Sequence, residues 1–287
     1  MPSRRQYLAR TGAGLGAALG LAGCLGELPQ SDREPLAFGE EATTGNVTVT
    51  PAKGHPQASI FYVSNVDHAS IERLDDEWVV FVSVFARSES GAPPSRDAFR
   101  LVAGDDEFTP LQKVGDAPLR TISPDERIVS NEYSPESGGG GWIAFTVPEE
   151  YESASDLELQ FGSDEPVVHW NLPDDAKERI AGPRPTFEVV SFDVPEQVSR
   201  GEETELVVTA RNMGPVDGLF RGCINTTGMY AFYEVLLPLE VGAEAATAKR
   251  LPSIYTREPG AKFSCELKTG ADNHRQTVEV VSKSDDA

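Results

Sequence analysis

Residue types that serve common enzyme chemistries are scarce in this chain of 287 residues, which has three cysteines, three methionines and four histidines. No histidine stands in an HxH, HExxH or His-plus-Cys pattern, so the spacing that marks a transition-metal enzyme is missing. The chain also lacks a Gly-x-Ser-x-Gly nucleophile motif, and the glycine run at residues 138–141 lacks the Lys-Ser/Thr of a phosphate loop. We therefore expect no enzymatic activity, no catalytic residues, no cofactor and no metal site.

Basic residues and long apolar runs are scarce as well. There are 46 Asp and Glu against 25 Lys and Arg, which gives a formal net charge of −21 at pH 7. A chain this acidic repels phosphate and has no basic stripe, which excludes a nucleic-acid partner. No segment approaches about 20 uninterrupted apolar residues, which excludes a membrane protein with several spanning helices.

The first 24 residues have the pattern of an export signal. Residues 1–23 combine a basic start at Arg4 and Arg5, a short apolar stretch rich in glycine and alanine, and small residues before Cys24, as a signal peptide does. The paired arginines indicate the twin-arginine export route. The motif Leu-Ala-Gly-Cys at residues 21–24 resembles the lipobox of bacterial and archaeal lipoproteins. This resemblance implies that Cys24 becomes the N-terminal residue, carries lipid on its sulfur and anchors the protein at the extracytoplasmic face of the membrane; the alternative is a buried thiol at the end of a helix.

The chain stays strongly acidic without this signal. The signal contains three arginines and no acidic residue, so residues 24–287 hold 22 basic and 46 acidic residues, a net charge of −24. Only seven of the 25 basic residues of the whole chain are lysines. A uniformly acidic, lysine-poor surface is typical of proteins in concentrated salt, where ions screen the self-repulsion. With the export motif, this composition resembles exported lipoproteins of halophilic archaea; an ordinary acidic secreted protein is the alternative.

Apolar spacing divides the rest of the chain into an all-β protein with two domains. Residues 24–46 contain prolines, glycines and mixed charges without a periodic pattern, which predicts a flexible tether after the signal and lipobox helix. Residues 47–173 hold seven or eight short strand patterns separated by turns, which predicts a β-sandwich. Residues 174–186 combine a short helix with a Gly/Pro-rich linker. Residues 187–283 hold about seven strand patterns in about 100 residues, the dimensions of an immunoglobulin-like sandwich. We thus expect two tandem immunoglobulin-like β-sandwiches.

The second half carries a resemblance to a family. Gly201-Glu202 leads into a strand pattern that ends at Arg211-Asn212-Met213-Gly214. This arrangement resembles the adhesion-related, CARDB-like domains of bacterial and archaeal surface proteins, and it covers roughly a third of the chain. The resemblance implies a binding or adhesion module and no enzymatic activity.

Two cysteines and two sequons are candidate modification sites. Cys223 and Cys265 lie in two predicted strands of the same domain, and the cell exterior permits disulfides, so we predict a bridge between them; two free, buried thiols are the alternative. Asn46 and Asn225 each begin an Asn-x-Thr sequon and are possible N-glycosylation sites. Three acidic clusters, at residues 75–77, 105–107 and 164–165, raise the possibility of loop calcium, but they lack the spacing of a calcium loop and are expected to be solvated turns.

These observations support a non-catalytic, lipid-anchored surface protein that binds a protein or a glycan or serves as an envelope scaffold. The alternative is an accessory or small-molecule-capture component of an uptake or redox system, with a pocket between the two domains. An extracellular hydrolase is a third hypothesis. Convergent polar groups in a deep pocket would favour capture, and a carboxylate pair in a cleft would favour hydrolysis.

Overall fold

The computed structural model describes residues 34–282 apart from five short gaps, which are residue 90 and residues 125–130, 163–166, 228–230 and 252–257. The predicted signal peptide, with Arg4 and Arg5, and the predicted lipidation site Cys24 lie outside the described residues. Nearly all regular structure that is described is β-strand, as predicted.

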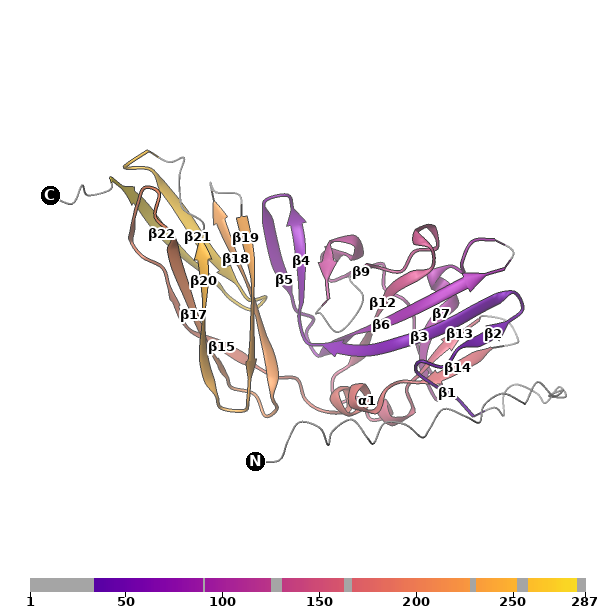
Figure 1. Cartoon of the computed structure of the whole chain (residues 1–287). Helices are drawn as coiled ribbons and strands as arrows, with labels where there is room; N and C mark the ends of the chain where they lie inside the picture. The colour runs from indigo at the N-terminus through magenta and orange to yellow at the C-terminus, as the bar shows by residue number, and fades with distance from the viewer. Residues whose placement is uncertain are drawn as a thin grey trace, which may run out of the picture. The chain divides into compact units, whose positions relative to one another are not determined.

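The first sandwich is built of two principal sheets with strand orders β12-β6-β3-β2 and β1-β14-β13-β7-β8, and two smaller sheets with orders β11-β4-β5 and β10-β9 (Figure 1). Its strands are β1 (Leu36–Ala37), β2 (Ala42–Thr44), β3 (Val47–Gln57), β4 (Ile60–Asn65), β5 (His68–Glu72), β6 (Glu77–Ser88), β7 (Phe99–Ala103), β8 (Asp106–Phe108), β9 (Lys113–Val114), β10 (Ala117–Pro118), β11 (Ile122–Ser123), β12 (Gly140–Pro148), β13 (Glu158–Phe161) and β14 (Val168–Asn171).

Strand β6 is the centre of this half. Its residues 78–84 are all buried, because one face packs in the core between the two principal sheets and the other face packs under a second apolar cluster. Trp78 and Val80 lie on the first face, and Val79 and Phe81 lie on the second. The unbroken run of β-forming residues at this position predicts burial on both faces, and the structure confirms it.

The predicted tether is wrong over its last part. Strand β1 pairs in parallel with β14, and β2 pairs with β3, so the chain is part of the sandwich from Leu36 onward. The indole N–H of Trp170 donates a hydrogen bond of 2.9 Å to the carbonyl of Glu40, and Phe38 packs against the first core. These strands are only two and three residues long, too short to give a periodic apolar pattern in the sequence.

A single α-helix is described, α1 (Asp174–Ala181), and it lies where the sequence predicts one. Ala176 and Ile180 bury its apolar side in the first core. The chain then passes through residues 182–186 into the second sandwich.

The second sandwich has sheets of strand order β15-β17-β20 and β16-β22-β21-β18-β19 around its own core. Its strands are β15 (Phe187–Asp193), β16 (Gln197–Ser199), β17 (Thr204–Asn212), β18 (Gly218–Thr227), β19 (Ala231–Leu239), β20 (Glu244–Leu251), β21 (Lys262–Lys268) and β22 (Asn273–Val281). The predicted exit after β17 is a turn closed by Asn212, whose Oδ1 accepts from the N–H of Gly214 and whose Nδ2 donates to the carbonyls of Val216 and Leu239.

The predicted disulfide is absent, since Cys223 and Cys265 are both free thiols. They lie on neighbouring antiparallel strands, β18 and β21, but Cys265 is opposite Thr226. Cys223 is thus three positions from the partner of Cys265, and an odd offset turns the two side chains to opposite faces of the sheet. Cys265 packs in the core of the second sandwich, whereas Cys223 packs in a separate cluster on the outer face. Burial raises the pKa of each thiol to about 12.

Candidate functional site

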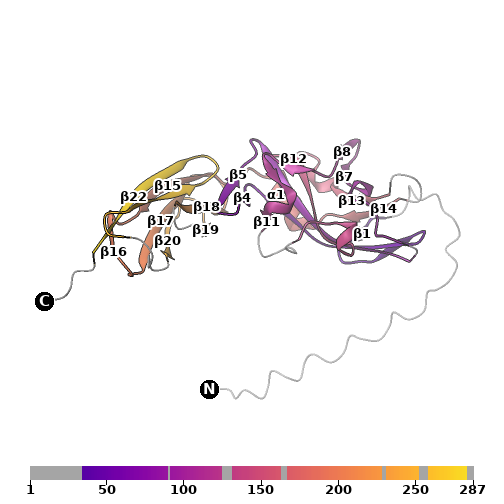
Figure 2. The same cartoon turned by 90° about the horizontal axis from the view of Figure 1, so that it is seen from above.

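The two sandwiches are joined by the β4–β5 hairpin, which packs on the outer face of β18 and β19 (Figures 1 and 2). Phe61, Ala69 and Ile71 from the hairpin form a buried cluster with Cys223. The ring of Phe61 lies 6.0 Å from that of Phe232. The first sandwich therefore reaches across and buries apolar surface on the second.

At the centre of this contact, Asn225 binds the backbone of the hairpin. Its Oδ1 accepts from the N–H of Ala69 at 2.9 Å, and its Nδ2 donates to the carbonyl of Ala69 at 3.0 Å. Asn225 is 2% exposed. A glycan cannot be carried by an amide that is buried and bonded in this way, so the glycosylation predicted at Asn225 is wrong for the folded protein. Asn46 is exposed in the β2–β3 turn and stays a prediction.

Arg184 binds the linker to the first sandwich, and no sequence motif marks this residue as functional. Its backbone N–H and Nε donate to the two carboxylate oxygens of Glu149 at 2.7 and 3.1 Å. Its Nη1 donates to the carbonyl of Glu77 at 2.6 Å and also to the carbonyl of Leu74. The Arg184 side chain is buried, so these bonds hold the chain between the sandwiches in one conformation.

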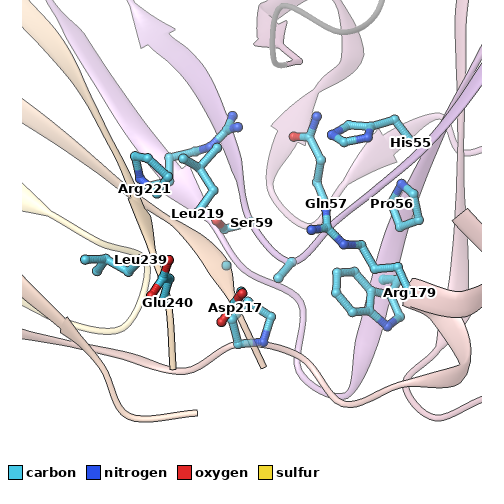
Figure 3. Close-up of a pocket in the computed structure, with 15 residues that line it drawn as sticks. His55, Pro56, Gln57, Ser59, Arg179, Asp217, Leu219, Arg221, Leu239 and Glu240 are labelled. Carbon is cyan, nitrogen blue, oxygen red and sulfur yellow. The ribbon is translucent and has the colours of Figure 1, made fainter. Parts of the chain in front are cut away.

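A cavity of about 500 Å³ lies beside these contacts, and we call it the inter-sandwich groove (Figure 3). One wall comes from the end of β3 and from Trp78, the base from Arg179 of α1 and Pro185 of the linker, and the other wall from the start of β18 and the end of β19. Gly218 in the second wall packs so closely against Pro185 that a Cβ at position 218 would collide with the proline ring. The full lining is His55, Pro56, Gln57, Ala58, Ser59, Trp78, Arg179, Pro185, Asp217, Gly218, Leu219, Arg221, Pro238, Leu239 and Glu240.

The first wall is the open edge of a sheet. Strand β2 pairs with Val47–Val49 of β3, and the last residues of β3, His55 to Gln57, pair with β6 and line the groove. Pro56 falls in this part of the strand, as prolines do at a sheet edge, because a proline has no N–H to donate.

Gln57 lines the groove with two buried polar atoms that have no partner, and the indole Nε1 of Trp78 in the same lining also has none within the described residues. The side chain of Gln57 is buried, with the whole residue 6% exposed, yet neither Oε1 nor Nε2 has a hydrogen-bond partner among the described residues. A buried polar group without a partner costs about 1–3 kcal/mol, and buried polar groups in native proteins are generally paired with protein, water or ligand. Figure 3 shows the side chains of Gln57 and Arg221 extending toward the same end of the groove, while Arg179 reaches in from the helix.

Charged groups of both signs line the groove. Arg221 is 4% exposed and lies 3.4 Å from Glu234, which compensates its charge. Arg179, Asp217 and Glu240 are exposed at the rim. Asp217 accepts a hydrogen bond of 2.8 Å from the N–H of Val241, so this carboxylate also closes the turn after β19.

The carboxylates of Asp217 and Glu240 do not have the arrangement of a glycosidase pair. They extend from neighbouring strand ends on one wall, since Gly218 pairs with Leu239, rather than from opposite sides of the groove. A hydrolytic pair must flank the bond that breaks.

The part of the chain that the structure describes contains neither a cluster of metal-binding side chains nor a membrane-spanning helix. No group of three or more His, Cys, Asp or Glu side chains there could hold a metal ion. No helix in that part has the length and apolar character needed to span a membrane. Of the three acidic clusters, the one at Asp164-Glu165 falls in a gap.

No protein-family model and no curated protein matches the chain. Among solved structures, a β-glucosidase from Listeria innocua in complex with glucose has 19% identity and a TM-score of 0.31, and the match covers 35% of this chain and 16% of that one. The CARDB domain of a Pyrococcus furiosus protein, in complex with di-metal ions, has 13% identity and a TM-score of 0.27 over 34% of this chain and 89% of that domain. A solution structure of the same domain has 14% identity, a TM-score of 0.28 and coverages of 34% and 95%.

These similarities are confined to about a third of the chain, and the chain spans only 16% of the length of the β-glucosidase. The CARDB resemblance expected from residues 201–214 is supported by these two structures, at low identity and over about a third of the chain.

Sequence reasoning missed the residues of the groove. The segment His55-Pro56-Gln57 has no apolar alternation and reads as a connection between two strands. Nothing in the sequence joins it to residues 217–221 or 238–240, which lie more than 150 positions later. A pocket between the domains was one of the alternatives, but the residues that line it depend on tertiary contacts.

Proposed function

We propose that this chain is a non-catalytic, extracytoplasmic binding protein, exported by the twin-arginine route and held at the membrane by lipid on Cys24. The observation that carries the binding role is the inter-sandwich groove with the unpaired amide of Gln57. The export and anchoring parts rest on the pattern of residues 1–24.

The groove favours small-molecule capture over adhesion through a flat surface. A volume of about 500 Å³ lies within the range of roughly 300–1,000 Å³ that is usual for small-ligand sites. The walls come from different sandwiches, but Asn225 and Arg184 hold both in place, so the site is formed before a ligand arrives. A preformed site loses little conformational entropy when it binds. Recognition of a protein or a glycan at the cell surface is the second candidate, and the modular β-sandwich architecture supports it.

Anchoring is tested by fractionation of cells that express the full chain in a host with both export systems. The wild-type protein should be found in the membrane fraction, with a mature mass that begins at a lipid-modified Cys24. Cys24→Ala should abolish the lipid modification, and Arg4→Lys combined with Arg5→Lys should leave the precursor in the cytosol. A wild-type chain found in the cytosol with residues 1–23 intact would contradict the proposal.

Capture is tested by native mass spectrometry of the protein purified from that membrane. We expect a small molecule to remain bound to the wild type and to be lost in Gln57→Leu. A matched control is Gln276→Leu, which changes an exposed glutamine on β22. A wild-type protein free of small molecules that instead retains a protein partner would favour the adhesion role.

A further inference from the structure

The inter-sandwich groove offers one buried group that both donates and accepts hydrogen bonds. A carboxamide such as that of Gln57 has two N–H donors and an oxygen with two lone pairs. Both of its atoms are buried and lack partners among the residues that are described. A ligand that satisfies this amide must supply an acceptor and a donor side by side, which adjacent hydroxyl groups do. A carboxylate supplies acceptors only, and an ammonium group supplies donors only.

The charges around the amide disfavour an ion. Arg179 and Arg221 line the groove together with Asp217 and Glu240. A ligand with a net charge of either sign therefore meets like charges as well as opposite charges, so the lining selects neither a cation nor an anion. A full charge placed against the buried, neutral Gln57 would also lose its hydration without a compensating partner.

The rest of the lining suits a molecule with both hydroxyl groups and C–H surfaces. Pro56, Pro185 and Pro238, with Leu239, present apolar surface around the polar groups. The rim carboxylates can accept hydrogen bonds from hydroxyls, and Arg179 can donate to them. The part of β3 that lines the groove carries Pro56, which has no N–H to pair with an added strand and so disfavours an extended peptide as the occupant.

We propose that the inter-sandwich groove binds a neutral, polyhydroxylated small molecule, a sugar or a cyclic polyol, with the Gln57 carboxamide as the buried hydrogen-bonding group and Arg179 at the rim. This inference rests on the proposed capture function and specifies its ligand class.

The test is ligand-observed NMR and calorimetry with the full chain as purified from its host, in a detergent without sugar headgroups. One set of probes is D-glucose, D-galactose, D-mannose and myo-inositol, and the other is glycine, L-glutamate and L-lysine. At least one neutral probe should bind saturably, and Gln57→Leu should weaken that binding about tenfold or more, the effect of losing hydrogen bonds to a buried group. Gln276→Leu should bind as the wild type does.

Arg179→Ala provides a second variant that cannot fail by disturbing a core, because Arg179 is exposed on α1. It should weaken binding of the same probe by a few-fold. The inference is overturned if no neutral probe binds, or if Gln57→Leu folds and binds as the wild type does. If only a charged probe binds, and Gln57→Leu abolishes that binding, the proposed ligand class is wrong but the proposed capture function is not contradicted.

Discussion

Two buried carboxamides, Asn225 and Gln57, lie on opposite sides of the contact between the sandwiches and have opposite hydrogen-bond states. Asn225 is 2% exposed and has both of its polar atoms paired with the backbone of Ala69. Gln57 is 6% exposed and has neither atom paired within the described residues. The difference shows that burial of a polar side chain does not by itself indicate its role. A satisfied amide holds the structure together, whereas an unsatisfied one costs stability and is available to a ligand.

Removal of the satisfied amide should have the largest effect on stability. Asn225→Leu leaves the N–H and the carbonyl of Ala69 facing an apolar side chain, at about 1–3 kcal/mol each. We expect the free energy of unfolding to fall by about 4 kcal/mol in urea titrations. Asn273→Leu, an exposed position on β22, is the control and should change it by less than about 0.5 kcal/mol. If the two variants lowered the free energy of unfolding by similar amounts, the structural role assigned to Asn225 would be contradicted.

Replacement of Arg184, which binds the linker to the first sandwich, should have the second largest effect on the free energy of unfolding. Arg184→Met leaves Glu149 and the carbonyls of Leu74 and Glu77 without their partner, and breaking a buried ion pair in this way costs about 3 kcal/mol. The control is Arg200→Met, because Arg200 is half exposed and lies 3.8 Å from Glu258. That surface pair should contribute less than about 1 kcal/mol. Thermal unfolding of both variants measures the difference.

Removal of the unsatisfied amide of Gln57 should not lower the free energy of unfolding, in contrast to removal of the amide of Asn225. Gln57→Leu replaces an unpaired polar group with an apolar one of similar size, so the free energy of unfolding should stay unchanged or rise by up to about 2 kcal/mol. The same variant should lose ligand. A fall of more than about 1 kcal/mol in the absence of ligand would mean that Gln57 is structural, and the contrast with Asn225 would disappear.

The alkylation rates of Cys223 and Cys265 measure, separately, how readily the two faces of the sheet around β18 become exposed. Burial raises both thiol pKa values to about 12, so in the native protein neither should react with iodoacetamide at pH 8. In Asn225→Leu, Cys223 should become reactive before Cys265, because only Cys223 lies in the cluster beneath the hairpin. Mass spectrometry of peptides after timed alkylation measures the two rates. Equal rates would show that the contact and the second core open together.

The same thiols add a dependence of stability on pH. Their folded pKa is higher than the ordinary value of 9.0, so their contribution is fully present below about pH 9. Above that pH the unfolded thiols lose their protons while the folded ones keep them, and stability falls as the pH rises toward about 12. Urea titrations of the wild type and of Cys223→Ala at pH 8 and pH 10.5 should show a smaller loss in the variant.

Added salt should change the stability difference between the two amide variants least, although it should raise the stability of the whole molecule. With a net charge of −21, ions that screen surface carboxylates should raise the unfolding temperature by a few degrees between low and molar KCl. The wild type, Asn225→Leu and Gln57→Leu should shift equally, because neither amide is charged. A flat or falling curve would contradict adaptation to high salt.

Much of the fold can be predicted from the sequence because strand and helix periods are local properties. The run at residues 78–85 predicts a strand buried on both faces, and Pro173 before residues 174–180 predicts the helix. Two modules joined by a short helix follow from these patterns. The prediction of a tether failed beyond Leu36, because strands of two or three residues have no measurable period.

The candidate site could not be predicted, because it depends on the register between neighbouring strands and on contacts between residues that are far apart in the sequence. Cys223 and Cys265 lie in adjacent strands, as expected, but an offset of three residues decides that they face apart. The sequon at Asn225 is indistinguishable from the one at Asn46 until β5 is packed against it. Gln57 becomes notable only when its neighbours are known and none of them pairs with it.

The bonds of Arg184 have a consequence for how the protein would exchange its cargo. They tie the interdomain segment to the carbonyls of Leu74 and Glu77, and Glu77 directly precedes Trp78 of the groove wall. Binding proteins that close on a ligand need a hinge at such a segment, and here that position is locked. Uptake and release should then proceed by diffusion through a permanently open mouth, with an association rate that does not saturate as ligand concentration rises.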